Sequence, residues 1–232
     1  AKGKKVIVVI LDGVGDRPCK QLNGQTPLES AKTPNLDFFA DNGRTGYMYS
    51  VKEKVAPESD VAVTSILGYD PYKYFTVRGP LEAFGAGIKI DEGDLALRTN
   101  FATAKIVKGE KKLIDRRAGR TLTTREAEIL AYAINKKVKL QTPLLKSVPF
   151  IFKSTFQHRG VLILKGGFSD NVSNTDPAYI KKGSFGVAAK ISDKVMPAKA
   201  LDDEEETQLS ANLINYFVEQ SYNILNNHLI TF

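Results

Sequence analysis

An apolar run near the start of the chain constrains the fold more than any other feature. Residues Val6 to Leu11 are all apolar and mostly β-branched, and Asp12 and Gly13 close the run. A continuous apolar run of this length is typical of a strand buried on both faces in a parallel sheet. Ligands bind at the carboxyl ends of such strands, so Asp12 is a candidate for holding a divalent cation. A turn aspartate before glycine is the alternative.

Helix signals follow this predicted strand. The segment from Thr26 to Glu29 combines a capping threonine, a proline in the first turn and a capping-box glutamate, and Thr33-Pro34 begins a second helix. A second capping box starts at Thr123, and the acidic segment from Asp202 to Glu206 begins a long amphipathic helix. A strand followed by helices predicts an α/β fold, with a parallel sheet covered by helices on both faces.

The middle of the chain has an alternating pattern instead. Between Leu95 and Thr103, Arg98 and Asn100 fall on the same face of a predicted strand. A turn near Lys108 to Glu110 leads to a second strand, which predicts an antiparallel hairpin. A further buried strand is predicted from Val161 to Leu164. This region therefore has α+β character.

Charge and composition narrow the partners and the location. The net charge of +7 favours an anionic partner such as nucleic acid, an acidic membrane or a phosphorylated metabolite, and charge alone does not choose between them. Because no long basic arm is present, we predict no nucleic-acid partner. A single cysteine, Cys19, indicates a reducing compartment, and we expect a cytoplasmic protein. No apolar run is long enough for a membrane span. Because the chain starts with Ala and stops within a helical pattern, we expect an excerpt of a longer protein.

Ser59 begins another predicted helix, which Gly68 ends. One interpretation is that Ser59 is an ordinary N-cap residue. The other is that Ser59 is a nucleophile, because free amides and the positive end of the helix dipole stabilise both an alkoxide and a bound phosphoryl group. Both interpretations use the same helix start.

Arginine is concentrated in the middle of the chain. A substrate with a phosphate and a carboxylate needs several guanidinium groups, each able to bind two oxygens. A solvated basic face is the alternative. His158, just before a predicted buried strand, is the better catalytic candidate of the two histidines. The arginines are Arg78, Arg98, Arg116, Arg117, Arg120 and Arg159.

Taken in order, these segments resemble one enzyme family. They resemble the archaeal type of cofactor-independent (2,3-bisphosphoglycerate-independent) phosphoglycerate mutases, members of the alkaline phosphatase superfamily. No single motif is specific, but the ordered set is. The motifs are Leu11 to Pro18, Thr26 to Glu29, Ser59-Asp60, Leu67 to Tyr72, Arg78 to Pro80, Arg98 to Thr103, Asp115 to Arg120, His158-Arg159 and Ser169 to Asn171.

The resemblance implies an architecture and a reaction. An alkaline-phosphatase-like domain, incomplete here, would comprise residues 1–94 and a returning helix at 202–232, with a substrate-binding α+β domain inserted at 95–201. Ser59 would carry the phosphoryl group between 3-phosphoglycerate and 2-phosphoglycerate, a step of glycolysis and gluconeogenesis. Two divalent cations (manganese, zinc or magnesium) and no bisphosphoglycerate would be needed, with Asp12 and Ser59 among the metal ligands. The implied substrate-binding residues are Arg78, Arg98, Asn100, Asp115, Arg116, Arg117, Arg120, His158, Arg159, Asp170 and Asn171.

The chain departs from the family pattern in two places. Val63 stands where family members commonly have a histidine, and the later Asp and His motifs that supply most metal ligands are absent. We therefore expect residues 1–232 alone to be inactive. Two alternatives stay open: a metal-dependent phosphatase or phosphotransferase on the same scaffold, and an inactive anion-binding fragment. The oligomeric state is not predicted.

Overall fold

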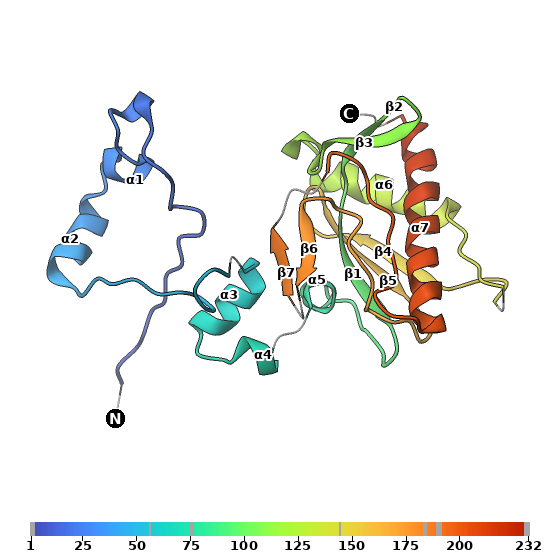
Figure 1. Cartoon of the computed structure of the whole chain (residues 1–232), viewed down its shortest axis with the longest axis horizontal. Coiled ribbons are helices and arrows are strands. Elements are labelled where there is room, and N and C mark those ends of the chain that lie inside the picture. Colours follow the sequence, from blue (N-terminus) through green and yellow to red (C-terminus); the bar gives the residue numbers. More distant parts are fainter. Residues whose placement is uncertain are drawn as a thin grey trace. The chain divides into compact units, whose positions relative to one another are not determined.

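The chain forms two compact units, residues 1–48 and 49–232 (Figure 1). The structure is a computed structural model that describes residues 3–55, 57–74, 77–143, 145–182, 185–188 and 192–229. Each unit has its own helices, and all the strands within these described ranges belong to the second.

The first unit contains short helices and no buried core. A 3-10 turn, η1, spans Lys20–Leu22, α1 spans Pro27–Ser30, and α2 spans Pro34–Asn42. The capping box predicted at the start of α1 is confirmed, because Thr26 and Glu29 bond reciprocally. None of residues 3–48 is buried.

The strand predicted from Val6 to Leu11 is not present. These residues have no sheet partner among the described residues, and their side chains are exposed, with Val6 and Ile7 both at 85%. A strand that is apolar on both faces needs neighbouring strands and covering helices to remove it from water. The described part of the chain supplies neither, so the predicted parallel pairing is not seen among the described residues.

The second unit contains the remaining elements. Its helices are α3 (Ser59–Ile66), α4 (Pro71–Tyr74), α5 (Arg78–Gly85), α6 (Thr124–Lys137) and α7 (Glu205–Asn226), with a 3-10 turn, η2 (Ala118–Arg120). Its strands are β1 (Leu95–Asn100), β2 (Thr103–Val107), β3 (Glu110–Asp115), β4 (Phe150–Ser154), β5 (Arg159–Leu164), β6 (Tyr179–Lys182) and β7 (Phe185–Ala188).

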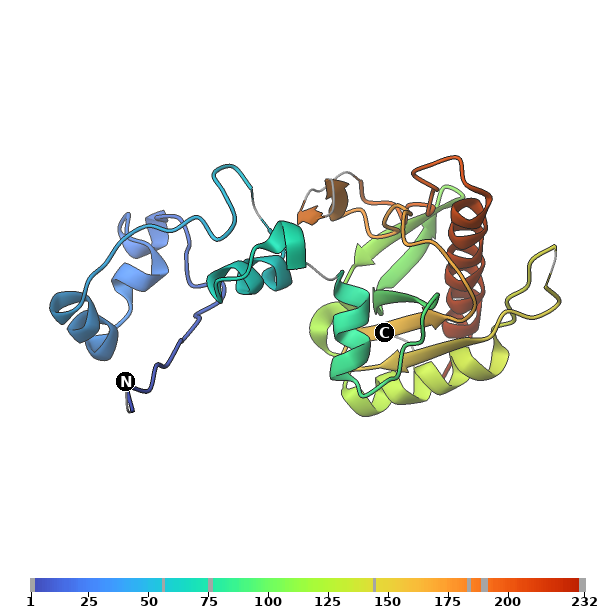
Figure 2. The same ribbon diagram turned by 90° about the horizontal axis from the view of Figure 1, so that it is seen from below.

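A three-stranded antiparallel sheet in the order β1-β5-β4 forms the centre of this unit (Figures 1 and 2). The central strand β5 is buried on both faces, as predicted for Val161 to Leu164. Val161 and Ile163 pack with Ala83 of α5 on one face, whereas Leu162 and Leu164 join the main core with α6 and α7 on the other. Every strand pairing among the described residues is antiparallel, so the fold is mixed α/β without the predicted parallel sheet.

The predicted hairpin is confirmed with a changed first strand. β2 and β3 pair antiparallel across the Lys108-Gly109 turn, and β6 pairs with β7. The alternating segment from Leu95 breaks at Phe101, whose backbone N donates to the carbonyl of His158. Its first part is β1, which pairs with β5 instead. β1 thus becomes an edge strand of the central sheet.

The two long helices are also confirmed. Thr123 and Glu126 form the predicted capping box of α6, and acidic residues occupy the first turn of α7. α7 is anchored by Asn215, whose side chain bonds both the N and O of Ala198. No described helix combines the length and apolarity required to cross a membrane.

Candidate functional site

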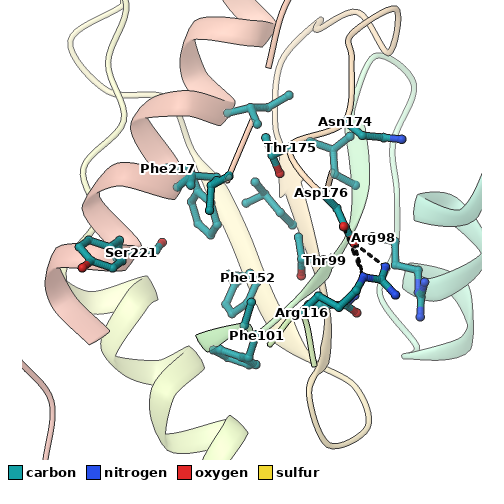
Figure 3. A pocket seen from close by; sticks show the side chains of 18 of the residues that line it. Arg98, Thr99, Phe101, Arg116, Phe152, Asn174, Thr175, Asp176, Phe217 and Ser221 are labelled. Atoms are coloured by element: carbon teal, nitrogen blue, oxygen red, sulfur yellow. Dashed lines mark hydrogen bonds and ion pairs between the residues drawn. The ribbon is translucent and has the colours of Figure 1, made fainter. Parts of the chain in front are cut away.

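A cavity of about 530 Å³ lies in the second unit, along the edge strand β1. Residues from the start of α5, the β2–β3 hairpin, α7 and the loop before β6 also line it. Figure 3 shows arginines at one end and phenylalanines at the other. Five of the predicted site residues line this cavity: Arg78, Arg98, Asn100, Arg116 and Asp170.

Arg98 is a largely buried arginine at the polar end. It lies on β1 with 18% of its side chain exposed, and its Nε is 3.3 Å from a carboxylate oxygen of Glu82. Burial lowers the pKa of Arg98, and the charge of Arg78 adds to this. Glu82, on α5, also accepts a hydrogen bond from Thr155. Glu82 was not predicted from the sequence, because its contact with Arg98 joins a helix to a strand that lies further along the chain.

Arg116 is fixed on two sides. Its Nε lies 3.1 Å and its terminal nitrogen 2.5 Å from Asp176 Oδ2, while the guanidinium stacks over the ring of Tyr179 at 4.8 Å. Burial lowers the pKa of Arg116, but the bonds and charge of Asp176, with Tyr179, outweigh this and raise it. Asp176 and Tyr179 were missed, and their only signal in the sequence was the polar character of the loop that contains Asp176.

His158 is buried close to the arginines. It is 7% exposed, and its Nδ1 has no hydrogen-bond partner among the described residues. Burial lowers the pKa of His158, and nearby positive charges lower it further. The neutral imidazole is therefore the favoured form. The charges come from Arg159, Arg120, Arg98 and Arg116.

The depressed pKa of His158 predicts a pH-dependent stability. The unfolded state takes up the proton first as pH falls from about 6.5, so the free energy of unfolding should decrease below that pH. His158→Gln should remove this part of the decrease. Denaturant titrations at about pH 7.5 and 5.5 measure the free energy of unfolding of both proteins. The carboxyl groups contribute equally to both proteins, so the difference between the two decreases is due to His158. An equal decrease in the two proteins would contradict the prediction.

Arg78 connects the cavity to the predicted nucleophile. Its guanidinium lies 3.0 Å from Glu58 and 3.8 Å from Asp60, the two neighbours of Ser59. Ser59 is exposed and is the first residue of α3, whereas the N-cap residue is Glu58. The N-cap interpretation of Ser59 is therefore wrong, and its hydroxyl lies at an open helix start.

Seven other predicted residues of the second unit do not line the cavity. Asp115 Oδ1 accepts a 2.7 Å bond from the backbone N of Arg117. The turn that follows is tight, as the sequence indicated, with Gly119 and Arg120 both at positive φ. Asn171 Nδ2 donates to Asp202 at 2.5 Å. The predicted residues outside the lining are Ser59, Asp115, Arg117, Arg120, His158, Arg159 and Asn171.

The structure does not test the predicted metal site. Asp12 is exposed in the first unit and Ser59 belongs to the second, and each unit is a separate body. Among the described residues, no group of three or more His, Cys, Asp or Glu side chains is positioned to hold a metal ion. These residues do not by themselves fit a two-cation centre.

Comparisons with known proteins agree on one family. Residues 40–231 match the family described as 2,3-bisphosphoglycerate-independent phosphoglycerate mutase. Relatives with that name include one from Methanosphaera stadtmanae, 43% identical over 97% of this chain, and one from Aeropyrum pernix, 42% identical over 97%. The chain covers 50% and 52% of these two proteins, so it spans about half the length of the curated relatives it matches.

One solved structure with the same activity in its name, and a second solved protein, are similar to this chain. A cofactor-independent phosphoglycerate mutase from Thermoplasma acidophilum is 35% identical, with a TM-score of 0.50, over 95% of this chain and 52% of that one. A protein from Pyrococcus horikoshii is 28% identical, with a TM-score of 0.57, over 95% of this chain and 44% of that one. Because the family match extends over most of the sequence, the chain belongs to the family of 2,3-bisphosphoglycerate-independent phosphoglycerate mutases.

Proposed function

We propose that this chain is part of a mutase that interconverts 3-phosphoglycerate and 2-phosphoglycerate. The observation that carries the proposal is the concentration of arginines around His158 and the cavity, in a chain of this family. A phosphoglycerate carries a phosphate and a carboxylate, and both are suited to guanidinium groups. The acidic partners of Arg98 and Arg116 hold the two side chains in place before substrate arrives.

In the proposed reaction, Ser59 is the nucleophile. Its Oγ gives up its proton and bonds to the phosphorus of 3-phosphoglycerate while the bond between phosphorus and the glycerate oxygen breaks, and that oxygen takes up a proton. The 2-hydroxyl of the retained glycerate then attacks the phosphoserine, loses its proton and restores Ser59. Arg98, Arg116 and neutral His158 hold the glycerate between the two transfers. Arg78, beside Ser59, stabilises the phosphoryl charge.

The proposal extends to the complete protein. Residues 1–94 and 202–232 would belong to a phosphatase-like domain whose parallel sheet includes Val6 to Leu11, and residues 95–201 would form the inserted substrate domain. The exposed apolar run supports this, because such a run is stable only beside other strands. Asp12 and Ser59 would supply two ligands to a pair of divalent cations of the manganese, zinc or magnesium type. The other ligands would come from residues beyond this chain.

A phosphatase on the same scaffold is the competing function, and the fate of the phosphoryl group separates the two. We expect a protein with this chain, extended to the length of its relatives, to convert 3-phosphoglycerate into 2-phosphoglycerate with little inorganic phosphate. Phosphorus NMR of the reaction measures all three species together. Stoichiometric release of phosphate without formation of 2-phosphoglycerate would show that the protein is a phosphatase and not a mutase.

Arg98 provides a test of the substrate site. Arg98→Ala should weaken phosphoglycerate binding by roughly 1.5 to 3 kcal/mol, as expected for a lost charged hydrogen bond. Arg125→Ala is the matched control, since Arg125 is exposed on α6 and does not line the cavity. Isothermal titration calorimetry with the extended protein measures both affinities. If the two variants bind phosphoglycerate with equal affinity, Arg98 has a structural role and does not bind the substrate.

A further inference from the structure

The cavity continues from its arginine end into an apolar arm. Phe101, Phe152 and Phe217 line this arm and are at most 7% exposed (Figure 3). Phe101 meets Phe152 edge to face, with ring centroids 5.6 Å apart, and Phe217 lies 5.5 Å from Phe152. Leu130 and Ile134 of α6 and Ile214 of α7 add aliphatic walls. All six of these residues belong to the main hydrophobic core.

Two hydroxyl groups that line the cavity are buried. Thr99 Oγ1 and Ser221 Oγ line the same cavity, and neither has a hydrogen-bond partner among the described residues. Ser221 is 8% exposed on α7. Thr99 of β1 pairs with Gly160 of β5, and a Cβ on Gly160 would lie 3.0 Å from Thr99 Oγ1. A buried hydroxyl without a partner is costly, so these two groups favour a bound polar atom.

Ser210 shows how a buried serine of the same helix is normally satisfied. It is 0% exposed, donates to the carbonyl of Glu206 at 2.8 Å and accepts a bond from the backbone N of Ser169 at 2.9 Å. Ser221 Oγ has no such bond among the described residues. The unpaired hydroxyl is thus a property of the arm rather than of serines on α7.

The proposed substrate does not account for the arm. A phosphoglycerate has charged groups at both ends and no apolar part, so it occupies the arginine end only. Water satisfies a hydroxyl well only where several polar groups surround it, whereas phenyl and aliphatic side chains dominate here. A ligand for this space needs an apolar body and very few polar atoms.

We propose that the apolar arm binds a small aromatic molecule with one hydroxyl or N–H group, of the phenol or indole class. Its ring would extend the edge-to-face packing of Phe101, Phe152 and Phe217. Its polar group would bond Ser221 Oγ or Thr99 Oγ1. Because Thr99 lies between Arg98 and Asn100 on β1, such a guest binds directly behind the substrate residues. The inference does not depend on the mutase reaction.

Phenol and toluene are a matched pair of probes, since they share a shape and differ in one hydroxyl. We expect phenol to bind the chain saturably and more tightly than toluene in isothermal titration calorimetry. Ser221→Ala should weaken phenol about fivefold and leave toluene unchanged. Ser210→Ala, the control, should lower stability but keep the preference for phenol. If neither probe binds saturably, the proposal is overturned and the arm holds only water.

A blocking variant locates the guest. Ser221→Leu places a larger apolar side chain in the arm and should abolish the binding of both probes. Unchanged binding in this variant would show that the probes occupy another place and would overturn the proposal. Should that variant not fold, Thr99→Val removes the second hydroxyl at nearly constant volume and should also weaken phenol but not toluene. All these measurements use binding, so they separate this inference from a failure of the proposed mutase function.

Discussion

Replacing Ser59 with alanine should abolish phosphoryl transfer in a protein extended to the length of its relatives. The hydroxyl is exposed at the first residue of α3, where unpaired helix amides and the flanking Arg78 stabilise an alkoxide and a phosphoryl group. Alanine keeps the helix and removes the only atom that forms the phosphoserine. Loss of a nucleophile typically lowers turnover by at least about 10⁴-fold.

Ser65→Ala is the control for this change. Ser65 belongs to the same helix but lies near its carboxyl end, away from the helix start. We expect this variant to retain turnover, and we expect mass spectrometry of the reacting wild-type protein to find phosphate on Ser59. Full activity of Ser59→Ala, or phosphate on another residue only, would remove Ser59 from the proposed mechanism.

Local features of the fold were predictable from the sequence. The capping boxes at Thr26 and Thr123 were predictable because all their bonds join residues three apart. The buried strand at Val161 to Leu164 was predictable because a continuous apolar run is typical of a strand that is covered on both faces of its sheet. In each case the interactions or patterns that determine the element involve residues only a few positions apart in the sequence.

Non-local contacts were not predictable in the same way. Asp176 bonds Arg116, and Glu82 pairs with Arg98, across long separations that no spacing rule connects. The arginines themselves were identified, but the carboxylates that orient them were not. The end of β1 was not predictable either. The alternating sequence pattern continues past Phe101, but the strand ends at Asn100, where the backbone N of Phe101 bonds the carbonyl of His158. The pairing of Val6 to Leu11 likewise depends on neighbours that the run itself does not specify.

The second large effect concerns the isolated chain. Residues 1–232 alone should show no mutase turnover at any concentration of manganese, zinc or magnesium. A catalytic cation pair needs several carboxylates and imidazoles arranged around open positions. Among the described residues no group of three such side chains gathers, and Asp12 with Ser59 is too small a set.

The exposed apolar segment near the start of the chain adds a physical reason for this inactivity. Val6 to Leu11 would present apolar side chains and unpaired backbone groups to water, which favours aggregation. Assaying conversion of 3-phosphoglycerate while titrating each metal tests the isolated chain, with the extended protein as the positive control. Circular dichroism on both samples separates a missing metal site from a failure to fold. Substantial turnover by residues 1–232 would mean that the chain assembles a metal site from its own residues, and the proposed division of ligands would be wrong.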